Sequence, residues 1–264
     1  MKKTLLLLIM TGLLMCSCNS KKSVSTASGT NDNSYYNQAK TFLAAAQYNR
    51  GIDAIDRAIE ANEKEHLEEL FFLKGFILHA YGETTDARSA YQEVLDMKNV
   101  YSPYKKQAKQ LLELNIEEEK WRKKRMETKE EDKTFTEEQI QEVSPEDLPF
   151  KPVEKLPRFT SCPESSNIEV KNCFNEVIKN HLVRNYNTDI GNMFGVYNKV
   201  RTYVTFKVDV DGKIIDMSGR SKSRFLSLEA KRVLFTLPEM VPGEQDGKNV
   251  VVPFTIPVTF APIQ

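Results

Sequence analysis

The chain has little of what catalytic, metal-binding and nucleic-acid-binding sites usually require. Its 264 residues include three histidines, four cysteines and one tryptophan, and 37 basic residues balance 37 acidic ones. His66, His79 and His181 are scattered, without the spacing to other ligands that a metal site needs. No P-loop, dinucleotide-binding glycine turn or Gly-x-Ser-x-Gly occurs. We therefore expect no enzyme, no metal or other cofactor, no small-molecule substrate and no nucleic-acid partner.

Long hydrophobic runs are also missing, apart from one near the N-terminus. Residues 5–15 are apolar and follow two lysines. The run is about half the roughly 20 residues that span a bilayer, which is typical of a secretory signal peptide. It ends in a sequence that resembles the lipobox of bacterial lipoproteins. The small Ser17 precedes Cys18, as that pattern requires, whereas Cys16 follows a methionine. The resemblance implies lipidation of Cys18; an ordinary cleaved signal with two incidental cysteines is the alternative.

A lipoprotein signal implies a mature chain in the cell envelope, anchored by its lipid and facing the periplasm. Several acyl chains would hold it stably, because a single chain binds only marginally. Asn19 stands where inner-membrane retention in enterobacteria uses aspartate, which favours the outer membrane. Disulfides persist outside the cytoplasm. We expect Cys162 and Cys173 to form one worth roughly 3 kcal/mol, with two buried thiols as the alternative.

The composition divides the chain into five segments. These are the signal peptide 1–18, a small polar tether 19–33, a helical domain 34–121, a charged and proline-rich linker 122–157, and a C-terminal domain 158–264. Mixed charges at the start of the linker predict a solvated helix that continues the preceding one. Contact of the basic residues 120–126 with anionic lipid head groups is the alternative reading.

The helical domain contains an internal repeat of 36 residues. Within the segments 47–62 and 82–97, an offset of 36 residues places Tyr48 on Thr84 and Gly51 on Ala87. The pattern resembles two degenerate tetratricopeptide (TPR) repeats, whose small residues lie where paired helices cross. The resemblance implies an all-α array with a groove for a protein partner. An unrelated bundle of four or five helices is the alternative.

A terminal helix must cover the apolar face that a helical pair leaves open. Residues 102–121 suit this role, with Ser102 as the N-cap and Pro103 in the first turn.

The C-terminal domain alternates helical and strand patterns. Apolar residues at helical spacing predict helices over residues 168–186 and 226–237. Residues 200–219 alternate apolar and polar side chains and turn at Asp211-Gly212, which predicts a hairpin. Residues 249–260 form the last strand. We expect an α+β fold in which an antiparallel three-stranded sheet packs on two helices.

Two prolines interrupt the last strand, and their parity is informative. Even-numbered residues from Val250 to Phe260 are all apolar, so they form the buried face. Successive N–H groups point to opposite sides of a strand, and Pro253 and Pro257 share parity. Both missing donors therefore lie on one side, as in an edge strand that is open there. The candidate edge consists of Val251, Pro253, Thr255, Pro257 and Thr259.

The succession of helix, hairpin "YVTFKVDVDGKI", helix "LEAKRVLFTLP" and strand "VVPFTIPVTF" resembles the C-terminal domain of TonB-type energy transducers. The likeness is to the form common among Bacteroidetes and covers about residues 155–261. "LPRFTSCPE" and "KNCFNEVIKNHL" resemble its flanking segments. The resemblance implies a periplasmic domain whose last strand accepts the TonB box of outer-membrane receptors by strand addition.

We therefore expect a non-catalytic periplasmic binding lipoprotein. Its TonB-like domain would engage periplasmic segments of TonB-dependent outer-membrane transport receptors, and its TPR repeats would hold a second protein. Two features depart from the family: the apolar run is too short for the membrane helix that couples TonB to its motor, and the prolines remove two donors. An alternative role for the prolines is therefore to protect the edge strand against unwanted pairing, instead of selecting a partner. A component of TonB-dependent energy transduction and nutrient uptake, or an envelope assembly scaffold without peptide binding, also remains open.

Overall fold

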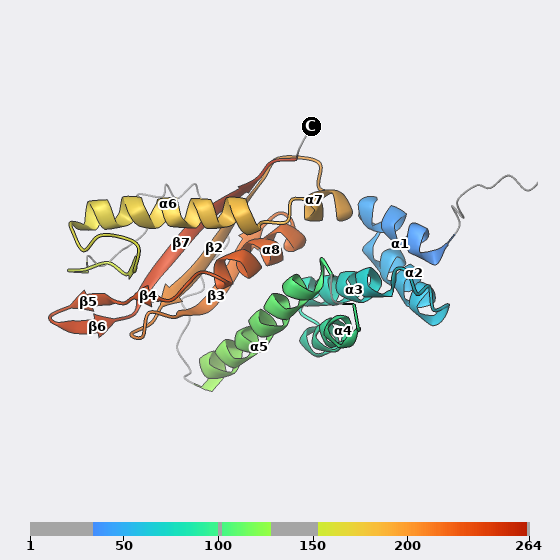
Figure 1. Cartoon of the computed structure of the whole chain (residues 1–264), viewed down its shortest axis with the longest axis horizontal. Helices are drawn as coiled ribbons and strands as arrows, with labels where there is room; N and C mark the ends of the chain where they lie inside the picture. The colour runs from blue at the N-terminus through green and yellow to red at the C-terminus, as the bar shows by residue number, and fades with distance from the viewer. Residues whose placement is uncertain (1–33, 100–101, 128–152, 263–264) are drawn as a thin grey trace, which may run out of the picture. The chain divides into compact units, whose positions relative to one another are not determined.

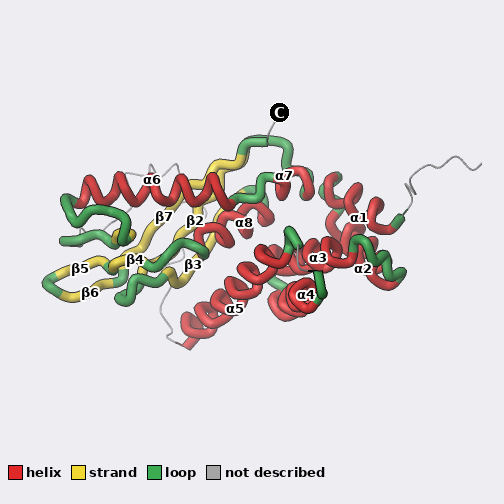
Figure 2. The backbone as a smooth tube through the Cα atoms, in the orientation of Figure 1, coloured by secondary structure: helices red, strands yellow, loops and turns green. Residues whose placement is uncertain are grey.

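The computed structural model describes residues 34–99, 102–127 and 153–262. The predicted signal peptide, Cys18 and the tether lie outside the described residues. An all-helical stretch precedes a stretch that contains all the described strands, as Figure 2 shows. The predicted combination of α-helices with antiparallel sheets is confirmed at this coarse level. None of the helices described is long and apolar enough to cross a membrane.

The helical stretch contains α1 (Tyr35–Ala44), α2 (Tyr48–Glu60), α3 (Leu67–Tyr81), α4 (Thr84–Asp96) and α5 (Lys105–Glu127). Helix α1 packs on α2, and α3 packs on α4. Helices α2 and α4 begin and end 36 residues apart. The predicted repeat period is therefore confirmed for the second helix of each pair.

Small residues permit the close crossing within each pair. A Cβ atom on Gly51 would lie 2.4 Å from the Leu43 side chain, and one on Gly75 would lie 2.7 Å from the Tyr91 ring. A methyl group at either position would therefore force the neighbouring side chain to shift, so both positions favour glycine. The aligned positions 39 and 87 are alanines, the next smallest choice.

Helix α5 closes the helical stretch. Ser102 Oγ accepts hydrogen bonds of 3.0 Å from the backbone N–H groups of Tyr104 and Lys105, so its predicted capping role is confirmed. Leu111 and Leu114 are fully buried. The helix packs on α4 and continues to Glu127, beyond the predicted domain boundary at residue 121.

The second stretch contains β1 (Arg158–Phe159), α6 (Asn167–Asn185), α7 (Asp189–Met193), β2 (Val200–Val208), β3 (Ile214–Ser221), α8 (Arg224–Phe235), β4 (Met240–Val241), β5 (Gly243–Gln245), β6 (Lys248–Val250) and β7 (Val252–Phe260). The main sheet has the antiparallel order β3-β2-β7. Helices α6 and α8 cover one of its faces (Figure 1). The predicted three-stranded sheet on two helices is present. The five-residue helix α7 and the short strands β1, β4 and β5 were not predicted.

The expected single strand over residues 249–260 is wrong, because two strands occupy this run. β6 pairs with β5, whereas β7 pairs with β2, and Val251 lies at the break between them. Asp246 and Gly247 both take positive φ values, of 53° and 69°, and form a two-residue turn. This geometry closes tight hairpins. The first residues of the run therefore pair locally and leave the main sheet.

Candidate functional site

Strand β7 forms one edge of the main sheet. It pairs with β2 over nine positions, from Val200 opposite Phe260 to Val208 opposite Val252, without a register shift. In the part of the chain that the structure describes, β2 is its only strand neighbour. The predicted pairing of this strand on one side is thus observed for β7.

The prolines sit inside this continuous pairing. Pro253 lies opposite Lys207, and Pro257 lies opposite Tyr203. A proline whose nitrogen faced β2 would remove a ladder hydrogen bond, so proline is confined to the open side of edge strands. The unbroken register supports this orientation at both positions. Val251 was placed on the same edge, but it precedes β7 and belongs to neither strand. The described edge thus carries Pro253, Thr255, Pro257 and Thr259.

Odd-numbered residues of β7 point to the outer face of the sheet, which no described helix covers. Thr255 contacts Thr205 of β2 through their hydroxyls at 3.1 Å, and Thr259 lies opposite Arg201. Pro253, Pro257 and Thr259 are exposed. The edge and this outer face together form one accessible surface.

The inner side of β7 is held by ring contacts. Phe254 stacks on Phe174 of α6, with ring centroids 4.7 Å apart, and on Phe206 of β2 at 5.7 Å. At the far end, a Cβ on Gly191 of α7 would lie 2.1 Å from the Phe260 ring. Only glycine fits there, so α7 positions the end of the strand.

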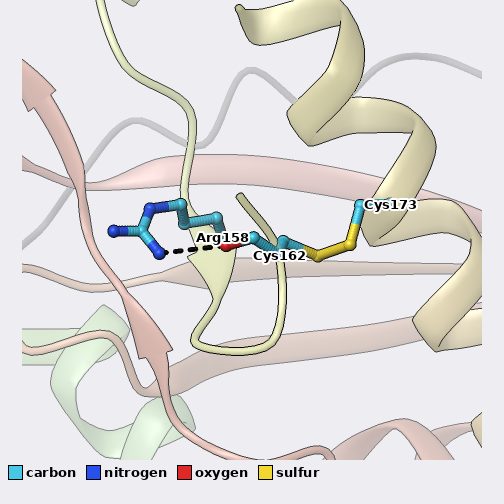
Figure 3. Close-up of a disulfide and its surroundings, with 3 residues drawn as sticks. All are labelled: Arg158, Cys162 and Cys173. Atoms are coloured by element: carbon cyan, nitrogen blue, oxygen red, sulfur yellow. Dashed lines mark hydrogen bonds between the residues drawn. A yellow bond between two sulfur atoms is a disulfide. The ribbon is translucent and has the colours of Figure 1, made fainter. Parts of the chain in front are cut away.

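A disulfide fixes helix α6 to the loop after β1. Cys162 and Cys173 are bonded, with their Cα atoms 5.7 Å apart, which confirms the predicted bridge. The Arg158 guanidinium donates a hydrogen bond of 3.2 Å to the Cys162 carbonyl, as Figure 3 shows. Because Phe174 follows Cys173 directly, the bridge restrains the helix turn that supports β7.

The helical and α/β stretches share an aromatic core. Phe194, after α7, stacks on Phe225 of α8 with centroids 3.9 Å apart. Phe76 of α3 lies 5.5 Å from Phe194, and the Tyr48 hydroxyl donates a 3.0 Å hydrogen bond to the Phe194 carbonyl. The described residues of both stretches accordingly belong to one compact unit. The face of α3 that carries Phe76 is therefore covered by Phe194 and Phe225 of the same chain.

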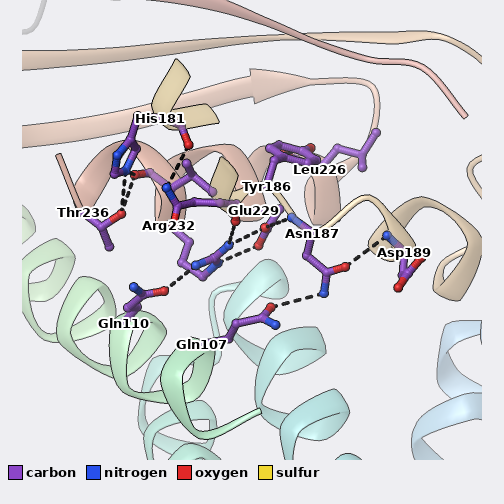
Figure 4. A network of polar contacts seen from close by, with 12 residues as sticks. Gln107, Gln110, His181, Tyr186, Asn187, Asp189, Leu226, Glu229, Arg232 and Thr236 are labelled. Carbon is purple, nitrogen blue, oxygen red and sulfur yellow. Dashed lines mark hydrogen bonds and ion pairs between the residues drawn. The ribbon is translucent and has the colours of Figure 1, made fainter. Parts of the chain in front are cut away.

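A buried ion pair on α8 also joins the α/β stretch to the helical stretch (Figure 4). Glu229 and Arg232 are 0% and 2% exposed, and their closest atoms are 2.6 Å apart. Arg232 also donates to Gln110 of α5 and to the Asn185 carbonyl, while the Asn187 N–H donates to Glu229. Burial raises the pKa of Glu229, and the Arg232 guanidinium opposes that shift.

A second polar network joins three helices. Glu118 of α5 accepts hydrogen bonds from His79 of α3 at 2.9 Å and from Lys231 of α8 at 2.5 Å. The Tyr91 hydroxyl lies 3.3 Å from the other His79 ring nitrogen. Burial alone would raise the pKa of Glu118, but His79 and Lys231 outweigh it and lower the pKa to about 2. Burial lowers the pKa of His79, so the neutral ring donates to an ionised carboxylate.

Sequence reasoning missed both polar networks. The spacing of Glu229 and Arg232 on the apolar face of α8 was an available signal, because residues three apart are neighbours on a helix. Their partners on α5 had no such signal. Within the described residues, no group of three or more His, Cys, Asp or Glu side chains could hold a metal ion.

Comparisons with protein-family models, with curated proteins and with solved structures find no match to this chain.

Proposed function

We propose that this chain is a non-catalytic binding lipoprotein of the cell envelope. In this proposal its α/β stretch, which resembles a TonB C-terminal domain, binds periplasmic segments of outer-membrane transport receptors by strand addition. The observation that carries the proposal is the position of β7 at the edge of the β3-β2-β7 sheet, with one described strand neighbour. An extended peptide can pair with such an edge through its backbone.

The prolines limit how a peptide can pair. Pro253 and Pro257 offer carbonyls but no donors, so Thr255 and Thr259 supply the remaining N–H groups of this parity. A docked strand would bond alternately to these donors and to the carbonyls around them. The same prolines would disfavour a long, uninterrupted partner strand, which suits a short peptide better than a second sheet.

The helical stretch, which resembles two TPR repeats with a cap, is proposed to bind a second protein. Phe76 of α3 is already buried against Phe194 and Phe225 of the same chain. A second partner would therefore use another face of these helices. The lipid anchor at Cys18 is proposed on the sequence pattern alone.

Substitution of Thr255 tests the proposal. Thr255→Pro would remove the central donor, and its parity matches that of the two tolerated prolines. Because one hydrogen bond contributes about 0.5–1.5 kcal/mol, we expect binding of a TonB-box peptide to weaken by a factor of about 2–10. Thr255→Ala is the matched control, since it loses the same hydroxyl but keeps the N–H, and it should bind normally.

The measurement is a peptide titration of the isotope-labelled full chain, followed by NMR. Chemical-shift changes concentrated on β7 would support strand addition. Absence of binding, or equal affinities of the proline and alanine variants, would contradict it.

A further inference from the structure

The outer face of the sheet carries a cluster of basic residues that we call the cationic patch: Arg201 of β2, Arg220 of β3, and Lys222 just after β3, around Tyr203. All four are exposed. Tyr203 lies opposite Arg220. Arg201 is therefore a diagonal neighbour of Arg220 on this face, and Lys222 follows the last paired residue, Ser221.

This arrangement is unfavourable for the stability of the sheet. Like charges on neighbouring strands of one face repel each other. None of Arg201, Arg220 and Lys222 forms an ion pair or a side-chain hydrogen bond with any residue that the structure describes. Positions where the sequence accepts such an unfavourable arrangement without compensation are often functional.

The rest of the outer face does not balance the patch. At the opposite end of the sheet, Lys207 is paired with Asp216 at 2.9 Å, and Arg125 contacts the same carboxylate. The β7 residues next to the patch, Pro257 and Thr259, are uncharged. Arg201, Arg220 and Lys222 thus gather positive charge at the end of the sheet where β7 finishes.

The patch lies close to the candidate edge. Arg201 is one strand from β7, and Arg220 and Lys222 are two strands away, which is about 10 Å. This distance is about one Debye length at 0.1 M salt. A strand docked on the open side of β7 adds one more spacing, so acidic residues that leave it would lie about 10 Å from Arg201 and about 15 Å from Arg220 and Lys222. Arg201 is therefore the cation within about one Debye length of them.

We propose that the partner strand is flanked by acidic residues at the end that lies beside Thr259, and that the cationic patch binds them. This inference rests on the proposed strand addition and adds the chemistry of the partner and the polarity of docking. At the other end of β7 the cation of the opposed strand, Lys207, is held by Asp216. An acidic polypeptide is favoured over a lipid surface because the patch is confined to one end of a strand-accepting edge.

The test compares three synthetic peptides with the same strand-forming core, titrated into the full chain. One has two glutamates at its N-terminal flank, one has them at its C-terminal flank, and one has glutamines at both flanks. Surface ion pairs each contribute about 0.2–1 kcal/mol, so one acidic peptide should bind about tenfold more tightly than the other two. The advantage should vanish near 1 M salt, where the Debye length is about 3 Å.

Charge reversal supplies the matched variants. Arg201→Glu should abolish the advantage of the acidic peptide, whereas Lys213→Glu, an exposed position in the β2–β3 turn beyond the patch, should preserve it. Equal binding of the two acidic peptides, or no effect of Arg201→Glu, would overturn the inference.

A further arm tests a lipid surface. Vesicles containing phosphatidylglycerol that bind the chain through Arg201, while the acidic peptides show no preference, would also overturn the inference. The proposed function fails separately: it requires shifts on β7 with the glutamine peptide, whereas the inference concerns only the difference between peptides.

Discussion

Glu118 gives the sharpest quantitative prediction, because it connects α3, α5 and α8 through two hydrogen bonds. Its pKa is lowered from 4.5 to about 2 in the folded chain. One pKa unit corresponds to about 1.36 kcal/mol. Glu118→Gln should therefore lower the free energy of unfolding by about 3 kcal/mol at pH 7.

The sign of the pH dependence follows from the direction of the shift. A carboxyl group whose pKa is depressed by folding stabilises the folded chain above its unfolded pKa of 4.5. That contribution is lost as the pH falls through about 2. The difference in stability between the native chain and Glu118→Gln should thus be greatest above pH 5 and shrink steadily in acid. Groups that do not contact Glu118 are common to both proteins and cancel in this difference, whereas the pKa of His79 depends on Glu118 and falls further when that carboxylate is removed.

Urea unfolding of both proteins, followed by circular dichroism from pH 7 to pH 3, measures this difference directly. Glu117→Gln is the matched control, because among the described residues Glu117 pairs with the exposed Lys120 alone, and the change should alter stability by less than about 1 kcal/mol. A loss below about 1 kcal/mol for Glu118→Gln, or a difference that does not depend on pH, would refute the role assigned to this carboxylate.

Two further stability predictions concern the α/β stretch. Arg232→Met should destabilise the fold by about 3–5 kcal/mol, because it leaves the Glu229 carboxylate buried without its partner, whereas the double variant Glu229→Leu/Arg232→Met should recover most of that loss in urea unfolding. Reduction of the Cys162–Cys173 bond should lower the free energy of unfolding by roughly 3 kcal/mol, and unfolding midpoints with and without reductant would show no difference if the bridge were dispensable.

Some of the site could be predicted because its signals are local. Alternation along β7 identified its buried face, and the shared parity of Pro253 and Pro257 identified it as an edge strand. The repeat period located the paired helices, and the two cysteines outside the signal region favoured a disulfide over two buried thiols, which the structure confirms. The break at Val251 was missed because the two strands differ in partner and not in composition.

The sequence by itself determined the longer helices, the β2–β3 hairpin and the edge character of β7. Each of these depends on periodicity, parity or turn chemistry within a short segment. Only the tertiary structure decided that the helical and α/β stretches share a core. The Tyr48 contact with Phe194 joins residues 146 positions apart, and that of Arg232 with Gln110 joins residues 122 apart. No local pattern encodes such pairs, because a buried aromatic ring or ion pair fits many neighbours until packing selects one. The cationic patch arises in the same way, since Arg201 and Arg220 become neighbours only when β2 and β3 pair.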